Sequence, residues 1–362
     1  MARHIAAMLT LLLIALVSLC ATARADGLLR LADCQIVDDR GSVKAMGVNY
    51  VDGFWSFASD GKRKAYLPYL DALAEAKVPF IRMAFGPWAD DKPDAQPVPQ
   101  IADFVANRDR YFERLDTFLA DLKARRIAAV LDVFWNIDPY TTYFGEPVTA
   151  SACPDSRTAA FLREVVAELA RRHGRDPTIW MIEFLNEGNL GVDFPRAPHS
   201  RADLVALMKG LAAALRGAGD RHLVDSGNSL PRSAAERLHQ RQGWAPDSLG
   251  DFYRALDDET PVDVASVHVY PEIAGDRPWD GDDVLATLPR LVAHSRRDCR
   301  PIFVGEFGAK DPMLEESFVA RIAQSGVPLA AAWGFGRPAF DPMTFGIDAR
   351  GRAQLARIGA GH

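Results

Sequence analysis

Apolar runs of strand length recur eight times along this chain, and their spacing limits the possible folds more than any other feature. Stretches with apolar residues at i, i+3, i+4 and i+7 lie between most of them, such as RYFERLDTFLADLKARR and TAAFLREVVAELARRH. Strands that alternate with amphipathic helices indicate parallel strands joined by crossover helices. The runs are VKAMGVNY (43–50), VPFIRMAFG (78–86), IAAVLDVFWN (127–136), IWMIEFLN (179–186), HLVDSGNS (222–229), VDVASVHVY (262–270), PIFVGEFG (301–308) and PLAAAWGFG (328–336).

Eight such units in about 300 residues predict a (β/α)8 barrel, the TIM barrel. The alternative is an open doubly wound sheet, but no GxGxxG follows the first strand, where the sequence reads GVNYVDGF. The segment 28–41 alternates like a β-hairpin, and we expect it under the N-terminal mouth of the barrel. Loops are expected at 51–65, 86–107, 137–156, 189–200, 229–261 and 271–282, where they would shape a cleft.

The first 25 residues have the pattern of a secretory signal peptide. Arg3 and His4 precede a long apolar stretch, which ends at the cleavage-site pattern Ala23-Arg24-Ala25. An uncleaved membrane anchor or a lipoprotein at Cys20 are the alternatives. We therefore expect a secreted or periplasmic protein, in which residues 26–362 form a single domain.

Charge and cysteine spacing exclude several functions. Loss of the signal peptide would move the net charge from −6 to −8, which does not suit a nucleic-acid binder, and no second apolar run reaches membrane-spanning length. The remaining cysteines lack metal-ligand spacing, so we expect no metal site built on them. We also expect no cofactor, and a monomer. Cys34 and Cys299 are both expected at the N-terminal mouth of the barrel and are the predicted disulfide pair, while Cys153 would lie on the opposite face.

Polar residues inside the apolar strands are the informative ones, because burial of a charge is costly without a partner. Most lie within the last residues of a strand, which in a barrel is the catalytic rim. They are Asn49, Arg82, Asp132, Asn136, Glu183, Asn186, Glu187, Asp225, His268, Tyr270 and Glu306.

Strand alternation separates these residues further. Glu183 and Glu187 share parity, so both are expected to face the lumen, with Glu183 deeper and structural and Glu187 at the rim. Asp132 is interpreted as structural too, and Asp225 as either structural or functional. Glu187 and Glu306, from the fourth and seventh strands, suggest an acid/base and a nucleophile; the alternative is two buried structural acids.

Four motifs in order carry a family resemblance: E-x-x-N-E in the fourth strand, H-x-Y in the sixth, G-E-F-G in the seventh and Trp333 in the eighth. Together they resemble the retaining glycoside hydrolases of clan A, and most closely family 5, the cellulases and mannanases. The resemblance implies Glu187 as acid/base, Glu306 as nucleophile and Asn186 as the ligand of the sugar 2-hydroxyl. It further implies that Arg82, His268 and Tyr270 support the nucleophile and that Trp333 is a sugar platform.

The sequence departs from the family at two positions. Gly188 stands where the cellulases usually have proline after the acid/base, and Phe134 stands where they usually have a histidine in the third strand. Further candidates for substrate binding or support are Asn49, Phe134, Trp135, Asn136, Trp55 and Trp88. An acid/base needs a raised pKa, so we expect Glu187 in a weakly polar setting near a negative charge.

The function that these residues predict is hydrolysis of a β-linked glycan, of cellulase, β-glucanase or β-mannanase type, by double displacement. The predicted partner is an oligo- or polysaccharide. Two alternatives use the same residues: a carbohydrate-binding barrel without turnover, and a transglycosylase in which a sugar in place of water accepts the intermediate.

Overall fold

The computed structural model describes residues 27–87, 99–195, 197–243, 245–256, 261–270, 284–309, 312–336 and 343–361. Within these residues eight parallel strands form one sheet in the order β8-β7-β6-β5-β4-β11-β10-β9. A parallel bridge from Asp225 to Val264 joins β8 to β9 and closes the sheet into the predicted (β/α)8 barrel. The strands are β4 (Ala45–Asn49), β5 (Phe80–Ala84), β6 (Ala128–Asp132), β7 (Ile179–Glu183), β8 (Leu223–Asp225), β9 (Ala265–Val269), β10 (Ile302–Phe307) and β11 (Leu329–Ala332).

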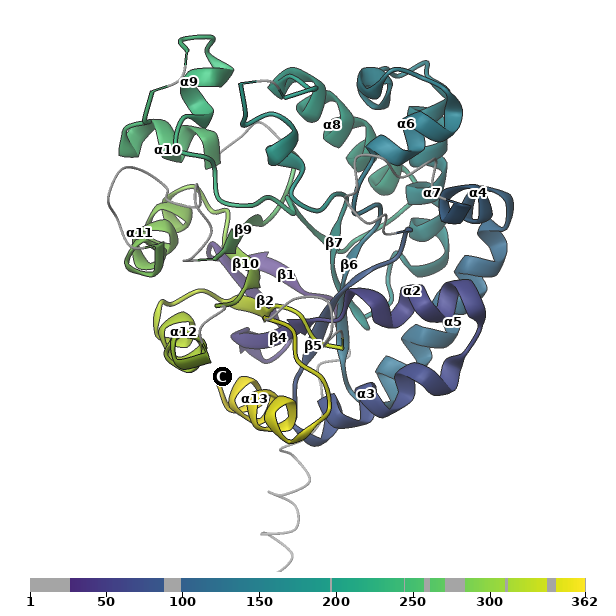
Figure 1. The fold of residues 1–362 in the computed structure, drawn as a ribbon, viewed down its shortest axis with the longest axis vertical. Coiled ribbons are helices and arrows are strands. Elements are labelled where there is room, and N and C mark those ends of the chain that lie inside the picture. The colour runs from purple at the N-terminus through teal and green to yellow at the C-terminus, as the bar shows by residue number, and fades with distance from the viewer. Residues whose placement is uncertain are drawn as a thin grey trace, which may run out of the picture.

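Helices surround the strands on the outside of the barrel (Figure 1). Two serines act as helix N-caps: Ser156 accepts from Ala159 N–H, and Ser200 forms a capping box with Asp203. The helices are α2 (Val51–Asp60), α3 (Arg63–Glu75), α4 (Pro99–Ala106), α5 (Arg108–Ala124), α6 (Asp138–Phe144), α7 (Arg157–His173), α8 (Arg201–Gly217), α9 (Ala235–His239), α10 (Leu249–Leu256), α11 (Val284–Arg297), α12 (Pro312–Gln324) and α13 (Ala349–Ala360).

Several segments that the sequence presented as loops contain helices, so that prediction was wrong. Helix α2 begins directly after β4 and buries Val51, Phe54 and Phe57, which are spaced three residues apart. Short helices also occupy 138–144, 235–239 and 249–256. They are too short to show a clear period in the sequence. None of the helices in the described ranges is long and apolar enough to span a bilayer.

The strand residues divide into two packed layers by their alternation. Phe80, Val130 and Met181 point into the lumen and form one core cluster, while Ile81 and Leu131 belong to the cluster under the helices. The next inward positions along these strands are polar. Apolar packing therefore fills the lower lumen, and charged side chains occupy the end where the strands terminate.

A small antiparallel sheet of β1 (Arg30–Ala32), β2 (Gln35–Asp38) and β3 (Gly41–Ser42) precedes the barrel. The first two strands are the predicted hairpin, and β3 adds a third. Leu29 and Ile36 pack in the same cluster as the lower lumen, so this sheet covers the N-terminal mouth.

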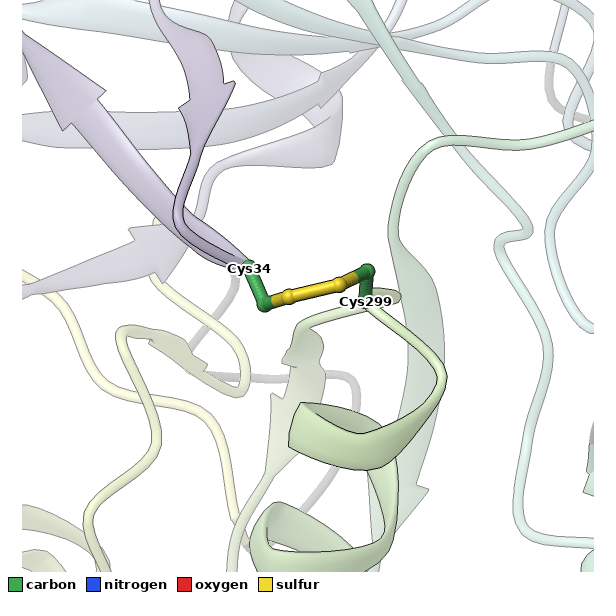
Figure 2. Close-up of a disulfide and its surroundings, with 2 residues drawn as sticks. All are labelled: Cys34 and Cys299. Carbon is green, nitrogen blue, oxygen red and sulfur yellow. A yellow bond between two sulfur atoms is a disulfide. The ribbon is translucent and has the colours of Figure 1, made fainter.

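The structure joins Cys34 and Cys299 by a disulfide, the pair that the sequence predicted (Figure 2). Their Cα atoms lie 4.2 Å apart, across 265 residues of sequence. The bridge connects the β1–β2 turn to the turn between α11 and β10. Cys153 is free and exposed.

Candidate active site

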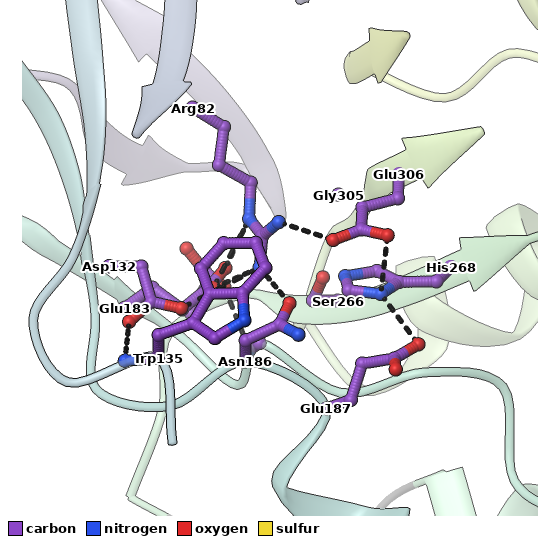
Figure 3. A network of polar contacts seen from close by, with 12 residues as sticks. Arg82, Asp132, Trp135, Glu183, Asn186, Glu187, Ser266, His268, Gly305 and Glu306 are labelled. Atoms are coloured by element: carbon purple, nitrogen blue, oxygen red, sulfur yellow. Dashed lines mark hydrogen bonds and ion pairs between the residues drawn. The ribbon is translucent and has the colours of Figure 1, made fainter. Parts of the chain in front are cut away.

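Arg82 is the centre of a polar network at the carboxyl ends of the strands (Figure 3). Its side chain is fully buried, and Nη1 donates to Glu306 Oε1 at 2.7 Å and to Asn49 Oδ1 at 2.9 Å. Nη2 donates to Asn186 Oδ1 at 2.6 Å and to Glu183, whose two oxygens also accept from Nε. One guanidinium therefore connects side chains from β4, β7, β10 and the segment after β7.

Glu306 is held by two donors from neighbouring strands. Arg82 binds one oxygen, and the Tyr270 hydroxyl donates to the other at 2.6 Å. Burial and the nearby charge of Glu306 raise the pKa of Tyr270 well above its usual value, so the phenol keeps its proton and can donate it in a hydrogen bond. Both oxygens of Glu306 are thereby fixed in one orientation.

An irregularity in β10 turns Glu306 toward the lumen. Phe303 points inward and Val304 outward, so strict alternation would send Glu306 outward to the helices. The register against β9 shifts between Val304 and Glu306, in the manner of a β-bulge. Gly305 lies at this shift, and its carbonyl accepts from Asn49 Nδ2 at 2.9 Å. Asn49 is fully buried and supports the strand ends from beneath.

Glu187 lies four residues beyond the end of β7, with φ 49° and ψ 36°. This left-handed backbone, and not strand alternation, directs its side chain. His268 Nδ1 lies 3.0 Å from Glu187 Oε1. Burial acts to raise the pKa of Glu187, but the hydrogen bond and charge of His268 and the charge of Arg232 outweigh it, so the pKa is lowered. The predicted upward shift was wrong, because the sequence does not show that His268 and Arg232 lie beside Glu187.

His268 lies between the two glutamates. Its Nδ1 is 3.0 Å from Glu187 and 3.5 Å from Glu306 Oε2, and Figure 3 shows both carboxyl groups directed toward its ring. One donor atom from each of the three residues lies within 4.8 Å of the other two. The structure therefore brings together the two carboxyl groups that the sequence paired.

The same three groups are close enough to hold a metal ion. Arg82 and Tyr270 already donate to both oxygens of Glu306, and the Arg82 nitrogen 2.7 Å away carries a positive charge. A metal ion at Glu306 would be repelled by that charge. Glu306 is therefore better suited to accept these two hydrogen bonds than to bind a metal. The absence of a metal cofactor stays a prediction.

Two tryptophans lie beside the network. Trp135 covers the Arg82 guanidinium at 5.1 Å, and its ring centroid lies 6.3 Å from that of Trp333. Asn186 accepts from Arg82 through its oxygen, and in Figure 3 its amide nitrogen points toward the side of His268 and the glutamates. Trp333 is partly buried against the same small cluster as Trp135.

Phe134 does not reach the site, which corrects the sequence interpretation. It is fully buried in the main core with its ring edge against Tyr140. Asp132 Oδ1 accepts from the backbone N–H of both Phe134 and Trp135, and Trp135 has φ 52°. This turn after β6 breaks the alternation, so Trp135 faces Arg82 and Phe134 faces the core.

The remaining candidates lie farther from Arg82 or outside the described residues. Asn136 accepts from Asp138 N–H through Oδ1 and lines a cavity next to Glu187. Trp55 is on α2, where it stacks on Tyr111 of α5 and packs against the core. Trp88 lies outside the described residues.

The cavity beside Glu187 has a volume of about 260 Å³. It extends from Trp135 and Glu187 to the start of α8, and Leu185 and Leu204 form part of its wall. A Cβ at Gly188 would lie 3.1 Å from Leu185 Cδ1 and 3.5 Å from Leu204 Cδ1. The glycine that replaces the family's proline therefore leaves this wall open.

Arg232 is a site residue that the sequence interpretation missed. Its charge acts on Glu187, and burial lowers the pKa of Arg232 itself. It follows β8 in the segment SGNSLPR, and an arginine so soon after a barrel strand was the available signal.

A (β/α)8 barrel with paired carboxyl groups at the carboxyl ends of its strands is an architecture that enzymes acting on glycosidic bonds use. Residues 42–328 match the cellulase family, glycosyl hydrolase family 5. The chain belongs to this family and is a glycoside hydrolase. No curated protein sequence matches this chain.

Solved structures share the fold at low identity. The endo-1,4-β-mannanase of Rhizomucor miehei superposes with a TM-score of 0.68 at 16% identity, covering 92% of this chain and 98% of that one. The endo-β-1,4-mannanase of Thermotoga petrophila gives 0.59 at 16% identity, over 88% and 76%. A β-glucanase of Saccharophagus degradans, in complex with cellotetraose, gives 0.60 at 16% identity, over 94% and 95%.

Proposed function

We propose that the protein is a retaining β-glycosidase that hydrolyses a β-linked glucan or mannan, with Glu306 as nucleophile and Glu187 as acid/base. The observation that carries this proposal is the spacing of the two carboxyl groups, an oxygen of each lying within 4.8 Å of the other. Retaining enzymes place these groups about 5 to 5.5 Å apart, whereas inverting enzymes leave about 6.5 to 9.5 Å for a water molecule.

In this mechanism Glu306 attacks the anomeric carbon while Glu187 protonates the leaving oxygen. Arg82 and Tyr270 bind the Glu306 oxygens and aim them at the reacting carbon. Glu187 then removes a proton from the water that releases the sugar. The Asn186 amide is the donor for the sugar 2-hydroxyl, and Trp333 is the platform below the ring.

The cellular compartment and the domain organisation of the protein are parts of the same proposal. Residues 1–25 act as a signal peptide, and the rest forms one secreted or periplasmic domain that works as a monomer. The Cys34–Cys299 bridge is compatible with an oxidising compartment. The signal peptide lies outside the described residues.

The test combines a substrate panel with nucleophile rescue. The wild-type protein is assayed on β-glucans, mannans and aryl β-glycosides, with the anomeric configuration of the first product followed by NMR. We expect release of sugar with retained configuration. The variant Glu306→Ala should be inactive, and azide should restore turnover and give a glycosyl azide of inverted configuration.

Other outcomes separate the alternatives. Binding without sugar release would support a carbohydrate-binding barrel. Products longer than the substrate would support a transglycosylase. Inverted product from the wild-type protein, or full activity of Glu306→Ala, would refute the assignment of the two glutamates.

A further inference from the structure

Three fully buried carboxyl groups, which the proposed mechanism does not use, form a row beneath the site. Asp132, Glu183 and Asp225 are register partners across β6, β7 and β8, and none has any exposed surface. Alternation directs all three side chains into the lumen, one layer above Val130 and Met181. We call Asp132, Glu183 and Asp225 the carboxyl row.

The row faces too little positive charge for three ionised carboxylates. Among the residues that the structure describes, the cation that contacts it is Arg82, which also binds Glu306. Arg82 Nη2 lies 3.7 Å from Asp132 Oδ2, beyond hydrogen-bond distance. Four ionised carboxyl groups around one buried guanidinium would leave large uncompensated charge, which protein interiors avoid by protonation.

The outer two acids each have one oxygen that lacks a hydrogen-bond donor. Asp132 Oδ1 accepts from Phe134 and Trp135 N–H, and Asp225 Oδ1 accepts from Gly227 N–H at 2.9 Å. Among the described residues, no group donates to Oδ2 of either aspartate, although both atoms are buried. Such a buried oxygen is satisfied if it carries a proton and donates a hydrogen bond to a neighbouring acceptor.

Glu183 is the acceptor that both outer acids reach. Its carboxylate receives Arg82 on both oxygens and has side-chain hydrogen-bond contacts with Asp132 and Asp225. A hydrogen bond between two carboxyl groups needs a proton on one of them. An ionised carboxylate offers about four acceptor positions, which Arg82 and two carboxylic acids fill.

We propose that Asp132 and Asp225 are carboxylic acids that both donate to an ionised Glu183, and that this row positions Arg82 for Glu306. The protons reside on Oδ2 of the two aspartates. One guanidinium then faces two carboxylates, Glu183 on one side and Glu306 on the other. The positioning role rests on the proposed function, whereas the protonation of the row does not.

The electrostatics of the row agree with this geometry. Burial, and then the charge of Glu183, raise the pKa of Asp132 and of Asp225 well above the usual value. Burial also acts to raise the pKa of Glu183, but Arg82 and the two acids outweigh it and lower that pKa. The Tyr140 phenol, whose pKa burial raises, is the other titratable group near Asp132 and stays neutral.

Gly227 packs closely against the Glu183 side chain. A Cβ at Gly227 would lie 2.7 Å from Glu183 Cγ and 1.9 Å from the Leu185 carbonyl, and Gly227 has φ +61°. The glycine therefore lets the chain after β8 close directly over Glu183. Arg82 is fixed in turn, because Glu183 holds Nε and Nη2 while Nη1 faces Glu306.

The test is infrared spectroscopy of the full protein at about pH 8, where ordinary carboxyl groups are ionised. We expect two C=O stretching bands of protonated carboxyl groups. Asp132→Asn and Asp225→Asn should each remove one band. The control Asp121→Asn should remove none, because Asp121 is a buried carboxylate whose pKa Arg63 and Tyr66 lower.

Rescue by the amide tests the positioning role. An asparagine can donate to Glu183 while its oxygen accepts the backbone N–H, but an alanine cannot. We expect Asp225→Ala to lower kcat roughly 10- to 100-fold through displacement of Arg82, and Asp225→Asn to recover most of that loss. Glu183→Gln should lower kcat without recovery, because no amide replaces its charge.

Each outcome decides the inference. Absent bands, bands that persist in both asparagine variants, or asparagine variants without native circular dichroism would overturn the protonated row. Bands that behave as expected with no rescue by asparagine would overturn the positioning role alone. The infrared result does not depend on activity, so failure of the glycosidase assignment would be seen separately, in the substrate panel.

Discussion

At the scale of single residues, Gly305 decides where the proposed nucleophile points. A Cβ there would lie 2.7 Å from Ser266 Oγ and 2.9 Å from His268 Nε2, both buried. We expect Gly305→Ala to displace His268 and Glu306 and to lower kcat roughly 10- to 100-fold. Gly308→Ala is the control, because its Cβ would meet no atom closer than 3.6 Å. Equal activity of the two variants would contradict this role of Gly305.

The Tyr270 hydroxyl is expected to contribute through one hydrogen bond to a charged oxygen. Such bonds are worth about 1.5 to 3 kcal/mol, so Tyr270→Phe should reduce kcat/KM about 10- to 100-fold while the fold is kept. Tyr140→Phe is the matched control: its hydroxyl is buried and has no hydrogen-bond partner among the described residues. A Tyr270→Phe enzyme as active as the control would show that Arg82 alone suffices for Glu306.

His268 is expected to set the alkaline limb of the pH–rate profile. Because Glu187 must be protonated to act as an acid, the lowered pKa of Glu187 moves the loss of activity to lower pH. His268→Gln removes the charge that lowers this pKa, so the alkaline limb of kcat/KM should move to higher pH. The profile is measured on an aryl β-glycoside, and a limb that stays in place would assign it to another group.

At the scale of elements, β6, β7 and β8 carry the carboxyl row and therefore a pH dependence of stability. The pKa of Asp225 is raised on folding, so its contribution is complete below the unfolded value near 4 and is lost as pH rises toward the folded value. Asp225→Asn should flatten the decline of unfolding free energy between about pH 5 and 8, by at most about 1.4 kcal/mol per pH unit.

Urea unfolding at several pH values measures this slope. Asp121→Asn should leave the slope in this window unchanged, because a lowered pKa contributes stability that is already complete above about pH 4 and is lost only below it. A slope in Asp225→Asn equal to that of the wild-type protein would mean that Asp225 is ionised in the fold.

The sequence predicted which residues form the strands and the rim better than it predicted the directions of individual side chains. Apolar runs and parity placed Glu183 in the lumen and Arg82 at the rim, because buried parallel strands keep a period of two. Parity does not account for the directions of Glu306 and Glu187, which a register shift and a left-handed residue set. The interpretation of Phe134 was wrong because Asp132 holds a local turn, accepting from the backbone N–H groups two and three residues further on, and this turn interrupts the strand alternation.

At the scale of the whole molecule, the disulfide joins the N-terminal sheet to the barrel across 265 residues of chain. Closing so long a loop restricts the unfolded chain strongly, so Cys34→Ser with Cys299→Ser should lower the free energy of unfolding by about 2 to 5 kcal/mol. Denaturant unfolding with and without reductant measures it. Cys153→Ser is the control, because that thiol is free, and it should leave stability unchanged.

The barrel is closed between β8 and β9 by one bridge, from Asp225 to Val264. In hydrogen–deuterium exchange we expect a three-residue strand with so short a joint to exchange its amide hydrogens sooner than the longer pairings of β5, β6 and β7. Asp225 belongs to both the joint and the carboxyl row, so each local opening of the barrel wall also removes a proton donor from Glu183. We therefore expect heat or mild denaturant to inactivate the enzyme while most of its helices and strands are still folded.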